Sequence, residues 1–158
     1  MLSFMPPSEQ QGHTYAISVS TFLQHPHFGK TVHADLFLQT LWRYRDQRKF
    51  LLHGFAIMPD HVHLLITPTD TSLAKCVQLI KGGYSFAART QTQKEIWHSG
   101  YHEHRLRDLA DFVNQLHYIA NNPPAAGVSH DYLYVHTHPQ HASSLDPCPI
   151  RLQQGSGL

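Results

Sequence analysis

Two histidines, His61 and His63, flank a single apolar residue inside a long apolar segment that runs from Leu51 to Ile66. On a β-strand, residues i and i+2 project from the same face, about 6.6 Å apart along the backbone. Both imidazoles can then bind one cation while Val62 points into the core. The spacing and its apolar setting therefore predict a two-histidine metal clamp.

Histidine pairs at this spacing recur in the chain, so spacing alone does not select one of them. With 15 histidines in 158 residues, chance predicts only about one or two such pairs. Only the pair at 61 and 63 lies in an apolar segment, and proline disfavours a buried strand at two of the others. The pair at 102 and 104 stays open as a competitor. The four pairs are His25/His27, His61/His63, His102/His104 and His136/His138.

Length, charge and cysteine content set broad limits on the class of protein. A chain of 158 residues fits one domain. The formal net charge of +1 neither indicates nor excludes nucleic-acid binding, because a neutral protein can carry a basic face. Cys76 and Cys148 form no paired framework, and no signal peptide or membrane-spanning apolar run is visible. We therefore expect a cytoplasmic protein with no membrane contact.

The pattern of apolar residues and turn signals predicts an α+β fold with flexible ends at 1–12 and 139–158 and one folded domain at 13–138. The element order is βαββαβα, and its first six elements are typical of a ferredoxin-like antiparallel sheet with both helices on one face. The seventh is an additional C-terminal helix. The expected strands are 14–22, 51–58, 61–67 and 101–106, and the expected helices are 34–50, 72–90 and 108–121.

Tyr118 and Asn122 stand four residues apart at the end of the last expected helix. Side chains at i and i+4 lie on one helical face, about 5–6 Å apart, so a phenol and an amide can face the same point. The same residues also fit a structural role, because Asn before Pro123 ends a helix and tyrosines often belong to an amphipathic core. The residues alone leave both interpretations open.

Two motifs together resemble the REP-associated tyrosine transposases, which belong to the IS200-like, single-tyrosine HUH transposases. They are MPDHVHLLITP at 58–68 and YIANNPPAAGV at 118–128, with IWHSGYHEHRLRD at 96–108 between them. The resemblance implies a domain for DNA transposition and recombination in which His61 and His63 hold a divalent metal. It further implies that Tyr118 is the nucleophile on the C-terminal helix and that Asn122 is the third metal ligand.

The chemistry that such a site would perform is transesterification of single-stranded DNA. The metal would polarise the scissile phosphate, and Tyr118 would displace the 3′-hydroxyl to leave a 5′-phosphotyrosine bond that conserves energy for rejoining. Magnesium or manganese suits a mixed nitrogen and oxygen site with open positions, although imidazoles also accept zinc, cobalt and nickel. No other cofactor is required.

Basic and aromatic side chains alternate between the second expected helix and the last strand, as in grooves that bind single-stranded or hairpin DNA. The alternative is a solvated basic face with core aromatics. For His102 and His104 we favour DNA contact or exposed strand positions over metal binding. The predicted DNA-binding residues are Lys81, Tyr84, Arg89, Trp97, His104, Arg105 and Arg107.

Three functions from different classes remain open on the sequence alone. The first is an active DNA strand transferase. The second is a domesticated module that binds hairpin or single-stranded DNA with little or no cleavage. The third is a ferredoxin-like RNA-binding or metal-storage domain, for which RNA would require surface aromatics on the sheet rather than histidines. Related transposases form dimers, and the sequence leaves the choice between a monomer and a homodimer open.

Overall fold

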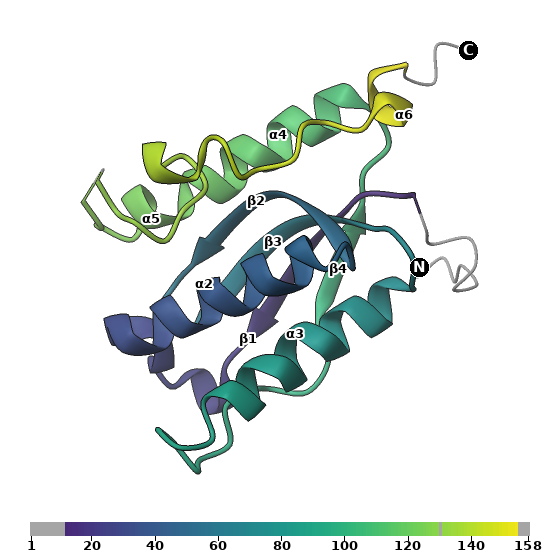
Figure 1. Ribbon diagram of the computed structural model, residues 1–158. Coiled ribbons are helices and arrows are strands. Elements are labelled where there is room, and N and C mark those ends of the chain that lie inside the picture. Colours follow the sequence, from purple (N-terminus) through teal and green to yellow (C-terminus); the bar gives the residue numbers. More distant parts are fainter. Residues whose placement is uncertain (1–11, 130, 155–158) are drawn as a thin grey trace.

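The computed structural model describes residues 12–129 and 131–154, so the predicted flexible ends at 1–11 and 155–158 lie outside the described residues. Within these ranges the chain forms one mixed α and β unit (Figure 1). Its elements are β1 Tyr15–Ser20, η1 Phe22–Gln24, η2 His27–Gly29, α2 Thr31–Asp46, β2 Phe50–Ile57, β3 His61–Pro68, α3 Leu73–Ala87, β4 His102–Arg105, α4 Leu109–Ala120, α5 Asn122–Ala125, η3 Pro139–His141 and α6 Ile150–Gln153.

The four strands form one antiparallel sheet in the order β2-β3-β1-β4, which confirms the predicted ferredoxin-like arrangement. Helices α2 and α3 cover one face of the sheet (Figure 1). The other face is covered by α4 and by the C-terminal segment that runs beside it. Strand β3 is therefore central in its sheet and covered on both faces, which explains why its sequence is apolar almost throughout.

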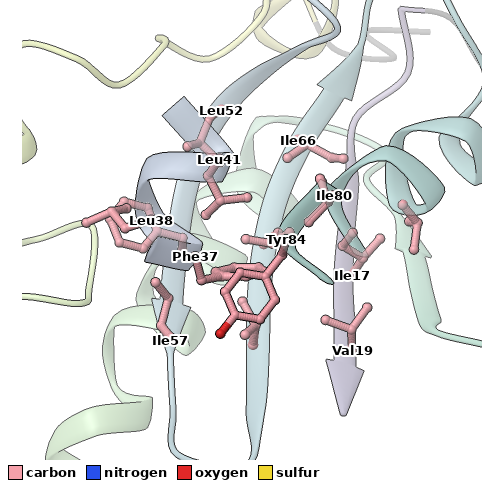
Figure 2. Packing of buried hydrophobic residues seen from close by; sticks show 14 of the residues in the cluster. Ile17, Val19, Phe37, Leu38, Leu41, Leu52, Ile57, Ile66, Ile80 and Tyr84 are labelled. Atoms are coloured by element: carbon pink, nitrogen blue, oxygen red, sulfur yellow. The ribbon is translucent and has the colours of Figure 1, made fainter. Parts of the chain in front are cut away.

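Each face of the sheet has its own apolar cluster. Under α2 and α3, strand residues such as Ile17 and Ile66 pack against Phe37 and Tyr84 (Figure 2). On the other face Leu65 belongs to a second cluster, whose remaining fully buried members are Ala56, Leu106, Phe112, Ile119, Val135 and Leu152. This second cluster fixes α4 over the strands that carry the histidine pair.

Helix capping signals located the starts of α3 and α4 correctly. The side chains of Ser72 and Asp108 accept hydrogen bonds from the first turns of α3 and α4, as expected for N-caps. The helix expected at 34–50 instead ends at Asp46, because Arg48 adopts a positive φ of 61° and Phe50 is already the first, fully buried residue of β2. Helix α4 ends at Ala120, before Pro123, as expected. Pro123 then lies in the first turn of a further short helix, α5.

The segment 139–154, expected to be a flexible tail, is instead packed against the domain. Asp146 accepts hydrogen bonds from the Arg45 guanidinium at 2.8 and 3.1 Å and from the backbone N–H of Leu52 at 2.8 Å. Leu152 of α6 is buried in the second apolar cluster. The described helices include none with the length and apolar character needed to cross a membrane.

Candidate active site

The two histidines of the predicted clamp lie side by side on the sheet face that α4 covers. His61 is aligned with Ser20 and His63 with Ser18 on the neighbouring strand. Their ring centroids are 4.8 Å apart, while Val62 between them points to the opposite face and is fully buried. Strand alternation thus places both imidazoles on one face, as the spacing predicted.

The turn residue before β3 orients the first of these rings. His61 Nδ1 and a carboxylate oxygen of Asp60 are 2.7 Å apart. A carboxylate only accepts hydrogen bonds, so it favours the tautomer with the proton on Nδ1 and leaves the lone pair of Nε2 free. Histidines that bind metals commonly donate their second ring N–H to a carboxylate in this way. Sequence reasoning missed the role of Asp60, although its place next to His61 was the available signal.

His63 is held in its neutral form. Its pKa is lowered to about 4, mainly by burial and then by the neighbouring His61, while a hydrogen bond with Asn122 partly offsets both effects. Near neutral pH the ring therefore carries no charge and retains the lone pair that a metal ligand requires.

Tyr118 near the end of α4 and Asn122 at the start of α5 both contact His63. The ring of Tyr118 meets that of His63 edge to face, with 5.8 Å between centroids, and the phenol is 60% exposed. The side-chain amide of Asn122 donates to the backbone carbonyl of Tyr118 at 3.0 Å. That bond holds the amide beside the helix end, where its oxygen is available to His63 or to a cation.

The position of α4 depends on close packing against β2. Gly54 of β2 faces Leu116, and a Cβ at Gly54 would lie 2.8 Å from the Leu116 side chain. Phe112 and Ile119 are buried on the same side of the helix. Tyr118 is therefore carried by a helix that is fixed at both ends of its apolar stripe.

The donor set fits a divalent cation. Among the described residues there is no cluster of three or more His, Cys, Asp and Glu side chains that could hold a metal. His61, His63 and the amide oxygen of Asn122 instead supply two nitrogens and one oxygen, which leaves several coordination positions for phosphate oxygens and water. The competing pair is arranged differently, because His104 Nε2 lies 2.9 Å from the Asp111 carboxylate.

Comparison with known proteins identifies the family. Residues 10–122 match the family model of IS200-like transposases. The chain belongs to the IS200-like transposase family. A protein of Haemophilus influenzae that is named as a REP-associated tyrosine transposase is 33% identical over 95 aligned residues, and the match covers 52% of this chain and 52% of that protein. The chain thus spans about half the length of this curated relative.

Two solved structures share the fold of this IS200-like transposase. A REP-associated tyrosine transposase bound to a REP hairpin superposes with a TM-score of 0.73 at 20% identity, over 93% of this chain and 87% of that chain. A Deinococcus radiodurans protein assigned as a transposase superposes with a TM-score of 0.53 at 20% identity, over 77% of this chain and 95% of that chain.

A shallow pocket of about 190 Å³ opens beside Tyr118 in this transposase, between α4 and strands β1 and β4. Its polar lining combines His63 with side chains that sequence reasoning had not joined to the site, among them Ser18 and Gln115. His102 also lines the pocket, since it is aligned with Ser18 on the same face as His63. Nothing in the sequence marked Gln115, because its neighbourhood arises from the packing of α4.

Two of the predicted DNA contacts are corrected by the structure of this transposase. Tyr84 is fully buried and its hydroxyl is 2.6 Å from His27 Nε2, so the phenol is not available to DNA. Trp97 belongs to the same core, and its indole N–H donates to the carbonyl of Lys81. Both aromatics hold the fold, because they pack between α2, α3 and the loop before β4.

The basic residues of the predicted set do not form one surface. Lys81 donates to the carbonyls of His98 and Gly100, and Arg89 donates to the carbonyl of Phe86 while its guanidinium lies over that ring. Both belong to the side of the sheet that α3 covers. The predicted DNA contacts His104, Arg105 and Arg107 are exposed on β4 and the turn after it. His104 lines the pocket at Tyr118, whereas Arg105 and Arg107 line a separate hollow of about 360 Å³.

Proposed function

We propose that this IS200-like transposase cuts and rejoins single-stranded DNA through a covalent bond to Tyr118. The observation that carries the proposal is the edge-to-face contact between Tyr118 and His63, at 5.8 Å between centroids. It puts an exposed hydroxyl nucleophile from a helix next to a neutral histidine of a metal-binding pair on a strand. A tyrosine that served only the core would not be 60% exposed at this point.

Each residue of the site has a defined task. His61, His63 and Asn122 would hold a divalent magnesium or manganese ion, which supplies Lewis acidity at the scissile phosphate when bound. Asp60 holds the tautomer of His61, and burial holds His63 neutral. The exposure of Tyr118 lets a phosphate in a polymer reach the phenol from solvent.

The reaction is a balanced exchange of phosphate esters. The Tyr118 oxygen attacks phosphorus, a new O–P bond forms, and the bond from phosphorus to the 3′-oxygen breaks. The phenol loses its proton, and the departing 3′-oxygen takes one up to leave as a hydroxyl. The product carries a 5′-phosphotyrosine bond, which a 3′-hydroxyl can attack in the reverse direction to rejoin the strand.

We propose single-stranded or hairpin DNA as the partner. The REP-associated transposase of similar fold is bound to a REP hairpin, and the exposed histidines His102 and His104 of β4 line the pocket beside Tyr118. Tyr118 and His63 of the same chain meet. A second copy of the chain is therefore not required to complete the site, whether or not a homodimer forms.

The experiment is a covalent-adduct assay on a labelled single-stranded hairpin with manganese, read by denaturing gel electrophoresis. The wild-type chain should give a slow-migrating protein–DNA band, and Tyr118→Phe should remove this band while DNA binding persists. Tyr101→Phe is the matched control, because it changes a half-buried tyrosine that directly precedes β4. This variant should keep the band. Binding without any adduct in the wild-type chain would instead support a domesticated DNA-binding module.

A further inference from the structure

A second hollow lies beyond the end of β1. It has a volume of about 610 Å³, compared with about 190 Å³ for the pocket beside Tyr118. Its walls come from the chain between β1 and α2 and from residues 92–96 after α3. An adjoining hollow of about 230 Å³ shares five lining residues with it and extends to the first turn of α2.

The loop that forms one wall is held in an unfavourable backbone conformation. Leu23 and Gln24 have φ values of 54° and 56°, in the left-handed region that residues with a Cβ rarely adopt. Hydrogen bonds hold the loop there: Thr21 donates to the Asp60 carbonyl and Phe22 to the Ile96 carbonyl. Such strain persists where the surroundings over-determine the backbone, and it is concentrated at binding sites.

The strained loop presents apolar side chains to solvent. Phe22 is 42% exposed and Leu23 is 82% exposed, and both line the hollow together with Pro26 and Ile96. An aromatic ring beside aliphatic groups is a surface on which a nucleobase can stack, and each stacked base typically contributes about 1–3 kcal/mol.

Polar and charged side chains also line the two hollows. Lys94 lines both hollows and Lys30 lines the smaller one, against one acidic lining residue, Glu95. His27 and His33 stack face to face at 4.2 Å between centroids. Both rings are buried, and burial is the main cause that lowers their pKa, to about 4 for His27, so the stack is neutral at physiological pH.

One polar atom of a residue that lines the smaller hollow has no hydrogen-bond partner within the described part of the chain. Nδ1 of His33 is buried and makes no hydrogen bond, although His33 lines the smaller hollow. A buried polar group without a partner costs about 1–3 kcal/mol.

We propose that this hollow binds one unpaired nucleotide of a DNA strand, with its base against Phe22 and Leu23 and its phosphate near Lys94. The exposed apolar side chains and the lysines match two parts of a nucleotide, the base face and the phosphate. The proposal rests on the proposed function only in that the same strand reaches Tyr118.

Asp60 connects the two sites. Its side chain accepts from His61, and its backbone carbonyl accepts from both the N–H and the hydroxyl of Thr21, the residue that precedes the strained loop. Ser20 is aligned with His61, so the loop begins two residues beyond the metal-binding position. A strand cut at Tyr118 can therefore place a nearby nucleotide in the hollow, which would fix the distance between cleavage and recognition.

The test is an abasic scan of a fluorescently labelled DNA hairpin with single-stranded flanks, with affinity measured by anisotropy on the full chain. One abasic position should weaken wild-type binding about tenfold. The same abasic change should have less than a twofold effect on Leu23→Asn, because the apolar wall is already lost. Asparagine tolerates a left-handed backbone, so this variant keeps the fold. Lys94→Ala should weaken binding at every position of the scan.

Two matched controls separate the hollow from general surface effects. Phe86→Ala removes another exposed phenylalanine, and Lys75→Ala removes a lysine from the first turn of α3, and neither residue lines the hollow. Both variants should bind DNA as tightly as the wild-type chain and should lose affinity at the same abasic position. The proposal would be overturned if every abasic position gave the same affinity for the wild-type chain. It would also be overturned if Leu23→Asn lost as much affinity at the sensitive position as the wild-type chain does.

The outcome is independent of whether DNA is cleaved. Tyr118→Phe should show the wild-type abasic pattern, because the hollow does not contain this tyrosine. A normal abasic pattern without any covalent adduct would reject the proposed function and keep the nucleotide site. A covalent adduct without any sensitive abasic position would support the proposed function and reject the nucleotide site.

Discussion

Nδ1 of His61 lies 2.7 Å from the carboxylate of Asp60, while the backbone carbonyl of Asp60 holds Thr21 on the other side. One residue thus orients an imidazole of the proposed metal site and fixes the loop beyond it. The two tasks use different atoms, so a side-chain substitution can remove the first and spare the second.

Asp60→Ala should therefore weaken manganese binding without removing a ligand. Loss of a carboxylate that orients a metal-bound histidine typically lowers the metal affinity by roughly 10- to 100-fold. Calorimetric titration should show this intermediate loss, whereas His61→Ala or His63→Ala should abolish binding and the thermal stabilisation by metal. Asp70→Ala, in another turn, is the control. Loss of manganese binding in His102→Ala instead would show that the clamp lies on β4.

His104 is tied to α4 by the Asp111 carboxylate, at 2.9 Å from Nε2. Asp111 also accepts the backbone N–H of Arg107 and lies in the first turn of the helix that carries Tyr118. We expect His104→Ala and Asp111→Asn to slow adduct formation to a similar extent. The double variant should be no slower than either single variant, because both changes break one contact. If His104 acts through DNA instead, its loss will weaken DNA affinity even when Asp111 is already replaced.

The sequence predicted the sheet and the histidine pair because both depend on local periodicity. Alternation places His61 and His63 on one face, and proline and aspartate mark the turn before them. Tyr84 shows the limit of the same reasoning. It shares the apolar stripe of α3 with Val77 and Ile80 and lies in the core. Its helical spacing should have outweighed the basic residues around it, which only suggested a DNA-binding surface.

The C-terminal segment could not be predicted for a different reason. Its composition of proline, serine and glutamine is typical of flexible chains. The contacts that hold it join residues about a hundred positions apart, such as the pair of Arg45 and Asp146. No periodic pattern reports on a partner at that separation. The meeting of Tyr118 with His63 is likewise a long-range contact, and only the motif resemblance indicated it.

The adjacent glycines Gly82 and Gly83 of α3 should respond in opposite ways to alanine. A Cβ on Gly82 would meet nothing within 4 Å, so Gly82→Ala should stabilise the helix by about 0.5–1 kcal/mol. A Cβ on Gly83 would collide with the Tyr44 ring of α2. Gly83→Ala should therefore be less stable than Gly82→Ala by about 1–3 kcal/mol, as measured by urea unfolding. Gly83→Ala with Tyr44→Ala should recover part of the difference, and equal stabilities of the two single variants would contradict the close approach of α2 and α3.

Acid should destabilise the fold partly through His27. Its folded pKa is lowered to about 4, first by burial and then by the nearby charges of His33, His25 and Lys30, whereas the unfolded value is about 6.5. The unfolded chain therefore takes up the proton first. The contribution of neutral His27 is complete above pH 6.5 and is lost as the pH falls towards 4, at up to about 1.4 kcal/mol for each unit of pKa difference. Burial also lowers the pKa values of His53 and His136, so the wild-type loss is shared.

A substitution at position 27 isolates the part of the acid-induced loss of stability that is due to His27. His27→Gln keeps a polar partner for the Tyr84 hydroxyl but cannot be protonated. Urea unfolding at pH 7 and pH 4.5 should show a smaller acid loss in His27→Gln than in the wild-type chain, even where its stability at pH 7 is lower. His25→Gln, an exposed neighbour, should retain the wild-type acid loss. An identical acid loss in His27→Gln and the wild-type chain would mean that His27 does not titrate with folding, and the acid sensitivity would then belong to the other buried histidines.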